Sequence, residues 1–224
     1  MAQGFDLSSL QIRLLSAAVL IPVVLVVLYT GGWPFITLLA GLAFLSLYEW
    51  GRMSFACDAP ERYYFAGAGV LYIPASFVAC YFVFQSFGFY WAMACLFMIW
   101  GSDTGAYVFG KTFGGPKLAE KISPNKTWSG FAGALLIPAV NGFVAVFIYS
   151  GVDGFQLGYA LTIAAIGVAL GLAGQAGDLL VSALKRRAGL KDTGDIIPGH
   201  GGVLDRIDSM LLAAPVFLIL MSLV

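Results

Sequence analysis

The chain has 224 residues, of which 60% are hydrophobic and 11% are charged. A soluble domain carries about 25% charged residues, so this composition excludes an ordinary water-soluble domain and predicts a membrane protein. The 12 basic and 12 acidic residues give a formal net charge of zero, which offers no argument for a nucleic-acid partner. The three cysteines have neither C-x-x-C spacing nor a metal-ligand pattern and are interpreted as packing residues.

Apolar segments divide the chain into about seven predicted membrane-spanning helices, each close to the roughly 17–25 residues that a span needs. The sequence therefore predicts an all-α, polytopic integral membrane protein with cytoplasmic catalytic loops. We expect one membrane-embedded catalytic domain over residues 1–224, with N-terminal spans over 12–84 and catalytic helices and loops over 89–224. The predicted spans are 12–30, 34–52, 64–84, 89–109, 130–150, 157–181 and 209–224.

The basic residues test this count of spans. With seven alternating spans, all twelve lie on the side of the N-terminus and of the loops 53–63, 110–129 and 182–208. The positive-inside rule makes that side cytoplasmic, so we expect a multi-pass protein of the cell (inner) membrane with a cytoplasmic N-terminus and active site. The basic residues are Arg13, Arg52, Arg62, Lys111, Lys117, Lys121, Lys126, Lys185, Arg186, Arg187, Lys191 and Arg206.

The segment 182–208 gathers basic side chains, carboxylates and glycines between two hydrophobic segments. Carboxylates hold metal ions that bridge phosphate oxygens, and Asp178, Asp205 and Asp208 can supply them. Asp205 and Asp208 share a helix face if the last span begins near them. Lys185, Arg186, Lys191 and Arg206 can bind phosphates, and the backbone N–H groups around Gly201 and Gly202 can approach an anion.

Several of these residues have a second interpretation. Asp178 lies within a predicted span, where an ionisable side chain indicates function by default, although a structural ion pair is the alternative. His200 is the single histidine, which excludes a zinc site built on several histidines. It can act as a general acid or base, or it can stabilise its turn through a hydrogen bond. Arg13 and Arg187 are also explained as topology anchors.

The loop over residues 110–130 contains Lys111 and the run Ser123, Asn125, Lys126 and Thr127. Its G-K-T has Gly105 at the upstream glycine position of a P-loop, but Gly105 lies in a predicted apolar span and not in a loop, so that motif is rejected. The loop is predicted to bind a nucleotide or phosphate, and a merely basic interfacial loop is the alternative. Asp103 is a second carboxylate at the same end of the membrane, unless it only forms a hydrogen bond with Thr104 or a neighbouring helix.

These blocks resemble the phosphatidate cytidylyltransferase (CDP-diacylglycerol synthase) family. The pattern S-x-L-K-R, four residues, K-D, then P-G-H-G-G-x-x-D-R-x-D is similar to the family signature at every fixed position, from Ser182 to Asp208. D-T-G-A-Y at 103–107, S-P-N-K-T at 123–127 and G-Q-x-G-D at 174–178 resemble further family blocks in the expected order. The resemblance is strong from Asp103 to the C-terminus. The N-terminal spans resemble the family only in their general apolar character.

The resemblance implies an enzyme that converts CTP and phosphatidic acid into CDP-diacylglycerol and pyrophosphate in phospholipid biosynthesis. It implies Mg²⁺ accompanied by K⁺, held by Asp178 and Asp205 with support from Asp208, in a homodimer embedded in the lipid bilayer. It implies phosphate binding by Lys126, Lys185, Arg186 and Arg206. Ser182 and Asp192, which are fixed positions of the signature, join the substrate-binding residues. The acid that often follows S-P-x-K-T in the family is absent, because Trp128 stands there.

Two other functional classes fit the sequence less well. A CDP-alcohol phosphotransferase requires a D-G-x-x-A-R motif that the chain lacks. A cation transporter would spread its carboxylates through the depth of the membrane, whereas Asp103 and Asp178 lie at one end, beside cytoplasmic lysines. A non-catalytic lipid-binding relative would be expected to lose the metal-binding carboxylates, and all three are present.

Overall fold

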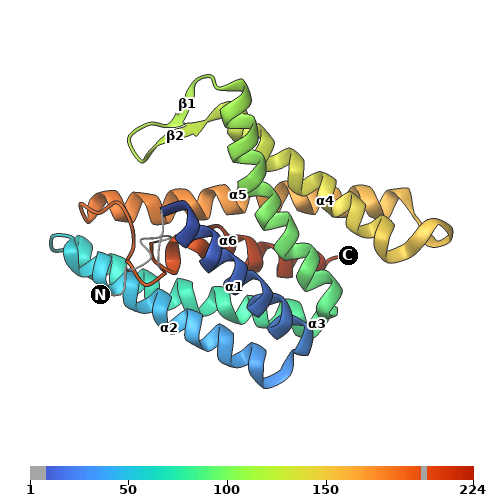
Figure 1. The fold of residues 1–224 in the computed structure, drawn as a ribbon, viewed down its shortest axis with the longest axis horizontal. Coiled ribbons are helices and arrows are strands. Elements are labelled where there is room, and N and C mark those ends of the chain that lie inside the picture. The colour runs from blue at the N-terminus through green and yellow to red at the C-terminus, as the bar shows by residue number, and fades with distance from the viewer. Residues whose placement is uncertain (1–8, 198–200) are drawn as a thin grey trace, which may run out of the picture.

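The computed structural model describes residues 9–197 and 201–224, with side chains from residue 18 onward (Figure 1). Helices make up most of the described chain, which confirms the predicted all-α class. The helices are α1 (Ser9–Thr30), α2 (Gly32–Ala56), α3 (Glu61–Phe113), α4 (Trp128–Gly154), α5 (Leu157–Arg187) and α6 (Leu204–Met221). Within the described residues, α2, α3, α4 and α5 are long and apolar enough to cross a membrane.

Helix α3 contains both of the spans predicted at 64–84 and 89–109. Its 53 residues would extend about 80 Å if straight, far more than the roughly 30 Å of hydrocarbon in a bilayer. The helix is broken at Gly88, which has φ of 76° and ψ of −179°. The two halves run in different directions in Figure 1. The break lies between the two predicted spans, within residues 85–88, and one glycine in a conformation that other residues avoid makes it.

The helix ends near the charged segment also differ from the expected boundaries. Helix α5 continues to Arg187, so Lys185, Arg186 and Arg187 lie in its last turn and not in a loop. Cations are favourable there because the C-terminal end of a helix carries a partial negative charge. Helix α6 begins at Leu204, five residues before the predicted span. Both shifts shorten the connecting segment and place Asp205 and Asp208 on a helix.

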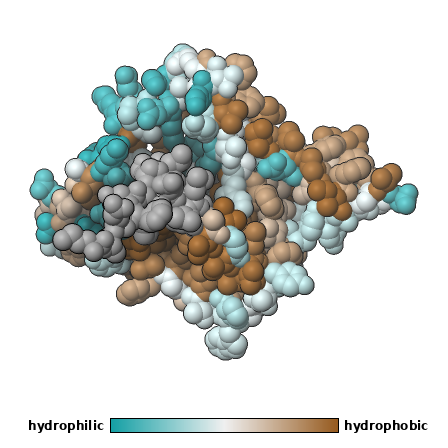
Figure 2. Space-filling model, viewed as in Figure 1, coloured by the Kyte–Doolittle hydropathy of each residue, from teal (hydrophilic) through white to brown (hydrophobic). Residues whose placement is uncertain are grey.

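The expected loop at 110–129 contains a small antiparallel hairpin. Strand β1 (Lys117–Ala119) pairs with β2 (Ser123–Thr127) in the register Lys117 to Thr127. The Thr127 hydroxyl accepts a hydrogen bond from Gly130 N at 3.1 Å and so caps α4. Figure 2 shows hydrophilic residues gathered over this hairpin and hydrophobic residues covering much of α4. The hairpin therefore belongs to the polar end of the molecule.

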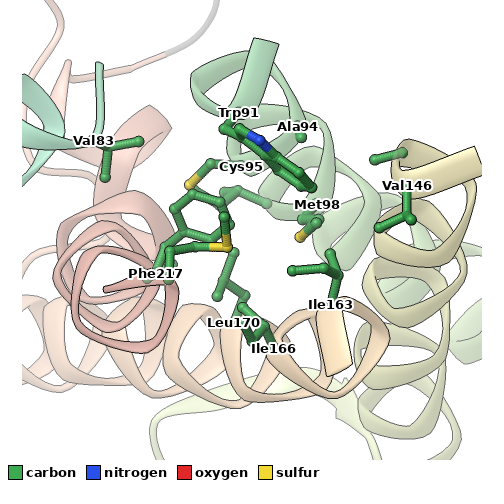
Figure 3. Close-up of a cluster of buried hydrophobic side chains, with 14 of the residues drawn as sticks. Val83, Trp91, Ala94, Cys95, Met98, Val146, Ile163, Ile166, Leu170 and Phe217 are labelled. Atoms are coloured by element: carbon green, nitrogen blue, oxygen red, sulfur yellow. The ribbon is translucent and has the colours of Figure 1, made fainter. Parts of the chain in front are cut away.

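Among the described residues, the helices pack through two apolar clusters and several glycine contacts. Figure 3 shows side chains of α3, α4, α5 and α6 meeting in the first cluster, including Met98, Ile163 and Phe217, each of which is fully buried. Gly105 of α3 and Gly133 of α4 face each other so closely that a Cβ on either would strike the other's carbonyl oxygen. Small residues let helix backbones approach in membranes, where the hydrophobic effect does not drive helices together.

Candidate active site

A cavity of about 480 Å³ opens between α3, β2, α4, α5 and α6. Its volume lies within the range of about 300–1,000 Å³ that is typical of small-molecule sites. Residues from four separate sequence blocks meet there, which agrees with most of the predicted site. The predicted site residues that line it are Asp103, Asn125, Lys126, Thr127, Asp178, Lys185, Asp192, Asp205, Arg206 and Asp208.

Asp178 lies near the C-terminal end of α5 and is held by two neighbours, Lys126 and Ser182. Lys126 Nζ is 2.7 Å from Asp178 Oδ2 and also donates to Gln175 Oε1 at 2.8 Å. The Ser182 hydroxyl donates to Asp178 Oδ1 at 3.1 Å. Gln175, Asp178 and Ser182 follow one another at helical spacing, so one face of α5 presents all three to β2. The ion pair considered as the alternative interpretation is therefore present, and it joins two predicted site residues.

Asp205, in the first turn of α6, has donors at both carboxylate oxygens. Lys185 Nζ donates to its Oδ1 at 2.6 Å, and both side chains are about nine-tenths buried, with exposed fractions of 11% and 7%. Its Oδ2 accepts from Thr193 N at 2.8 Å and from Gly202 N at 3.1 Å, and it lies 3.0 Å from Thr193 Oγ1, whose single proton is shared with Glu49 Oε2 at 2.8 Å. Among the described residues, Oδ1 therefore has fewer donors than Oδ2 and more capacity to bind a cation.

Asp103 and Asp208 bring two more carboxylates to the same cavity as Asp178. The Ser209 hydroxyl donates to Asp103 Oδ2 at 3.3 Å, so the hydrogen-bond partner of Asp103 belongs to α6 and is not Thr104. Asp208 Oδ1 accepts from Ser209 N at 2.8 Å. Carboxylates that share a partly buried site repel one another, and a bound cation relieves that repulsion. The arrangement therefore favours cation binding.

Other predicted residues lie away from the described cavity lining. Lys111 Nζ contacts Tyr107 Oη at 3.2 Å. Arg186 donates to the carbonyl oxygens of Ile122 and Leu190, at 3.2 and 3.1 Å, and so ties the hairpin to the end of α5. Ser123 and Lys191 are not among the lining residues, and Ser182 reaches the cavity only through Asp178. His200 lies outside the described residues, so its predicted role stays a prediction.

The glycine turn before α6 binds carboxylates of the protein itself. Gly202 N donates to Asp205, and the next two amides, Val203 N and Leu204 N, donate to Glu49 at 2.9 and 2.8 Å. Gly201 has φ of 82°, a conformation that favours glycine. The Gly202 amide, which was expected to approach a substrate anion, thus already has an anionic partner, and substrate binding by Gly201 and Gly202 remains a prediction.

Sequence reasoning missed Glu49. This residue of α2 is fully buried, with 0% of its surface exposed, and contacts the segment that leads into α6. A signal was available, because a carboxylate within a predicted span is costly and indicates a specific role. What the sequence could not show was its partners, which lie 144 to 155 residues further along the chain.

The donor set fits magnesium bound together with phosphate groups. Among the described residues, no three histidine, cysteine or acidic side chains form a ready ligand cluster. Mg²⁺ is usually held by one or two carboxylates plus substrate phosphates and not by an all-protein cage. The carboxylates around the cavity supply oxygen ligands of the right kind, and the lysines beside them suit phosphates.

A second cavity, of about 630 Å³, adjoins the charged one. Its lining is mostly aliphatic and aromatic and comes from α1, α2, α3 and α6. Asp103 and Arg206 line both cavities, so a polar compartment and an apolar one meet at a charged boundary. A protein with membrane-length apolar helices and these two adjoining compartments fits the class of membrane proteins that bring a polar substrate together with a lipid.

Comparison with known proteins identifies the family: the chain belongs to the cytidylyltransferase family, whose model matches residues 11–85 and 59–224. Similar proteins are phosphatidate cytidylyltransferases. That of Rickettsia felis is 37% identical over 215 residues, covering 94% of this chain and 92% of the relative. That of Rickettsia typhi is 36% identical, with 95% and 92% covered. That of Staphylococcus aureus (strain COL) is 34% identical, with 93% and 78% covered. The family resemblance inferred from the motifs is confirmed.

Proposed function

We propose that this chain is a phosphatidate cytidylyltransferase, which converts CTP and phosphatidate into CDP-diacylglycerol and pyrophosphate. The observation that carries the proposal is the pair of adjoining cavities that share Asp103 and Arg206. CTP is polar and polyanionic and suits the charged cavity. Phosphatidate has a phosphate head group and two acyl chains, so it needs both environments at once.

In the proposed reaction an oxygen of the phosphatidate phosphate attacks the α-phosphorus of CTP. One P–O bond forms, the bond between the α- and β-phosphates breaks, and pyrophosphate leaves with its electron pair. The nucleophile is already an anion, so the reaction needs charge neutralisation and positioning more than a strong base. This requirement matches a site with several lysines, arginines and carboxylates.

Lys126, Lys185 and Arg206 are the cations placed to neutralise phosphate charge. Lys126 and Lys185 are each paired with a carboxylate, at 2.7 and 2.6 Å, which fixes their ammonium groups at the cavity wall. Asn125 and Thr127 flank Lys126 on β2 and line the same cavity. We assign these β2 residues to nucleotide binding, and Arg206, which also lines the apolar cavity, to the head group of the lipid.

Magnesium, accompanied by potassium, is the proposed cofactor. Asp178 and Asp205 would hold the metal, with Asp208 beside them. Among the described residues, Asp205 Oδ1 accepts a hydrogen bond from Lys185 alone, and this capacity for a further ligand supports that assignment. When bound, the metal supplies a positive charge that screens the two anionic substrates from each other and stabilises the leaving group.

We further propose seven spans, with the charged cavity at the cytoplasmic face of the inner membrane. The break at Gly88 divides α3 into two spans, and α1 and α6 complete the count. Basic side chains of the hairpin and of the end of α5 then face the cytoplasm, as the positive-inside rule requires. The homodimer implied by the family resemblance remains a prediction, which light scattering of the purified protein would measure.

Cysteine labelling in spheroplasts tests this orientation. Cysteine placed at Lys121, in the hairpin, should react with a membrane-impermeant maleimide only after permeabilisation. Cysteine placed at Asp153, at the opposite end of α4, should react in intact spheroplasts. Labelling of the hairpin position in intact spheroplasts would show that the orientation is reversed.

Replacing Lys126 with methionine tests the proposed nucleotide site. The change keeps the length of the side chain but removes its charge and leaves Asp178 without its ion-pair partner. Loss of one charge-assisted contact should lower kcat/KM for CTP by about 10- to 100-fold. Lys121→Met, an exposed lysine on the same hairpin, is the matched control and should stay close to wild type. Equal effects of the two substitutions would contradict the assignment.

A further inference from the structure

Glu49 reaches from α2 into the segment that carries half of the charged site. Its Oε2 accepts hydrogen bonds from Thr193 Oγ1 at 2.8 Å and from Leu204 N at 2.8 Å, and its Oε1 accepts from Val203 N at 2.9 Å. Val203 and Leu204 form the N-terminus of α6, where unpaired amides and the helix dipole favour an anion. One carboxylate therefore fixes both the start of α6 and the side chain of Thr193.

The burial of Glu49 indicates that these contacts belong to the folded core and are not incidental surface contacts. The side chain has no exposure to solvent, and Thr193 is 2% exposed. A buried carboxylate destabilises a protein unless donors satisfy it, and here three donors do. Because α2 contributes no lining residue to the charged cavity, Glu49 acts on that cavity only through the groups that it holds.

The glycines of the connecting segment make room for this carboxylate. A Cβ added to Gly194 would lie 2.9 Å from Glu49 Oε1. A Cβ added to Gly202 would lie 2.5 Å from Glu49 Oε2 and would overlap the Thr193 hydroxyl. Glycine therefore stands at two described positions of the connecting segment that lie directly against Glu49. This packing explains why glycine occupies position 202 without any contact to substrate.

Thr193 links Glu49 to the charged site. Its hydroxyl lies 2.8 Å from Glu49 Oε2 and 3.0 Å from Asp205 Oδ2, and its backbone N–H donates to the same Asp205 oxygen. Asp205 in turn holds Lys185 through Oδ1 at 2.6 Å. The chain of contacts runs from α2 through the connecting segment to α6 and α5, and ends at two residues that line the cavity.

We propose that Glu49 is a positioning residue, which acts through Thr193 to hold Asp205 and Lys185 in the orientation that the charged cavity needs. This inference rests on the proposed function for its kinetic consequence, but its structural consequence is independent of that function. Because Glu49 satisfies both Thr193 and the start of α6, its loss should loosen residues 189–197 and 201–206 and leave the helical core of α3, α4 and α5 intact.

Glu49→Gln in the full-length protein in detergent is the first test. Gln keeps the shape but loses the charge and one acceptor oxygen. Amide exchange should accelerate about 10-fold or more in peptides covering 189–206 and stay unchanged in peptides of α4. With CTP and phosphatidate, kcat should fall about 10- to 100-fold. Glu61→Gln, which alters an exposed carboxylate paired with Arg187, is the control and should change neither quantity.

Variants of Thr193 test the same chain of contacts if Glu49→Gln fails to fold. Thr193→Val should reproduce the loss in kcat, whereas Thr193→Ser, which keeps the hydroxyl, should restore it to within about 3-fold of wild type. Where both fold, Glu49→Gln with Thr193→Val should lose no more than the worse single variant, because the two residues act in series. Serine that fails to restore kcat, or additive losses in the double variant, would overturn the inference.

Amide hydrogen exchange tests the role of Glu49 independently of the proposed function. If wild-type protein makes no CDP-lipid, the proposed function fails, yet faster exchange confined to 189–206 would still support the role of Glu49. If Glu49→Gln leaves exchange and kcat at wild-type values, or lowers only the melting temperature, the positioning role is wrong.

Discussion

Replacing Asp178 with asparagine is expected to abolish cytidylyl transfer, with kcat falling by about 1,000-fold or more. Asn has nearly the same shape but no charge, so the cavity would lose a proposed metal ligand, and Lys126 would lose the carboxylate 2.7 Å away that orients it. The substitution should therefore impair both the positioning of the substrate phosphates and the neutralisation of their charge. The measurement is the rate of CDP-lipid formation by purified variant in detergent with excess magnesium.

Asp153→Asn is the matched control for this substitution. Asp153 is exposed near the end of α4 that lies opposite the hairpin, so the same chemical change should leave the rate near wild type. The melting temperatures of both variants establish that they are folded. A folded Asp178→Asn variant with more than about a tenth of wild-type activity would contradict the central role of this carboxylate.

The largest expected effect on stability comes from Gly133→Leu. A Cβ at Gly133 would lie 2.7 Å from Phe109 Cβ and would overlap the carbonyl oxygen of Gly105, so α3 and α4 would have to separate. Overpacking of this kind destabilises by about 3 kcal/mol or more, because two backbones cannot both give way. Since β2 and the cavity depend on the α3–α4 contact, activity should be lost with the fold.

Gly158→Leu in α5 provides the comparison, because a Cβ there meets nothing within 4 Å. Thermal unfolding in detergent should show a strongly lowered midpoint for the Gly133 variant and a midpoint near wild type for the Gly158 variant. If both variants melted like wild type, the close α3–α4 contact would not exist as described.

Much of the site could be predicted because its chemistry is rare in this chain. Charged residues are few, so Asp103, Lys126, Asp178 and Lys185 were recognisable as exceptions within or beside apolar segments. The structure brings them to one cavity although they come from α3, β2 and α5. Long apolar segments likewise predicted α2, α4 and α5 closely, because apolar length is a strong signal for membrane helices.

The remaining features depend on contacts that a linear pattern does not contain. The hairpin has strands of three and five residues, too short to show alternation. Lys111 and Arg186 are as basic as Lys126, and only the path of the chain separates those that line the cavity from those that bind elsewhere. Glu49 is the one acidic residue of its predicted span, and its partners became visible only when α2 was placed against the start of α6.

Transfer of a defined phosphate tests the account most directly. Purified protein in detergent is incubated with phosphatidate, magnesium and CTP that carries a radioactive label on either the α- or the γ-phosphate. The account predicts that the α-label becomes chloroform-soluble as CDP-diacylglycerol, that the γ-label is released as pyrophosphate in equal amount, and that EDTA stops both. Chloroform-soluble γ-label, or no lipid product from well-folded protein, would contradict cytidylyl transfer to phosphatidate.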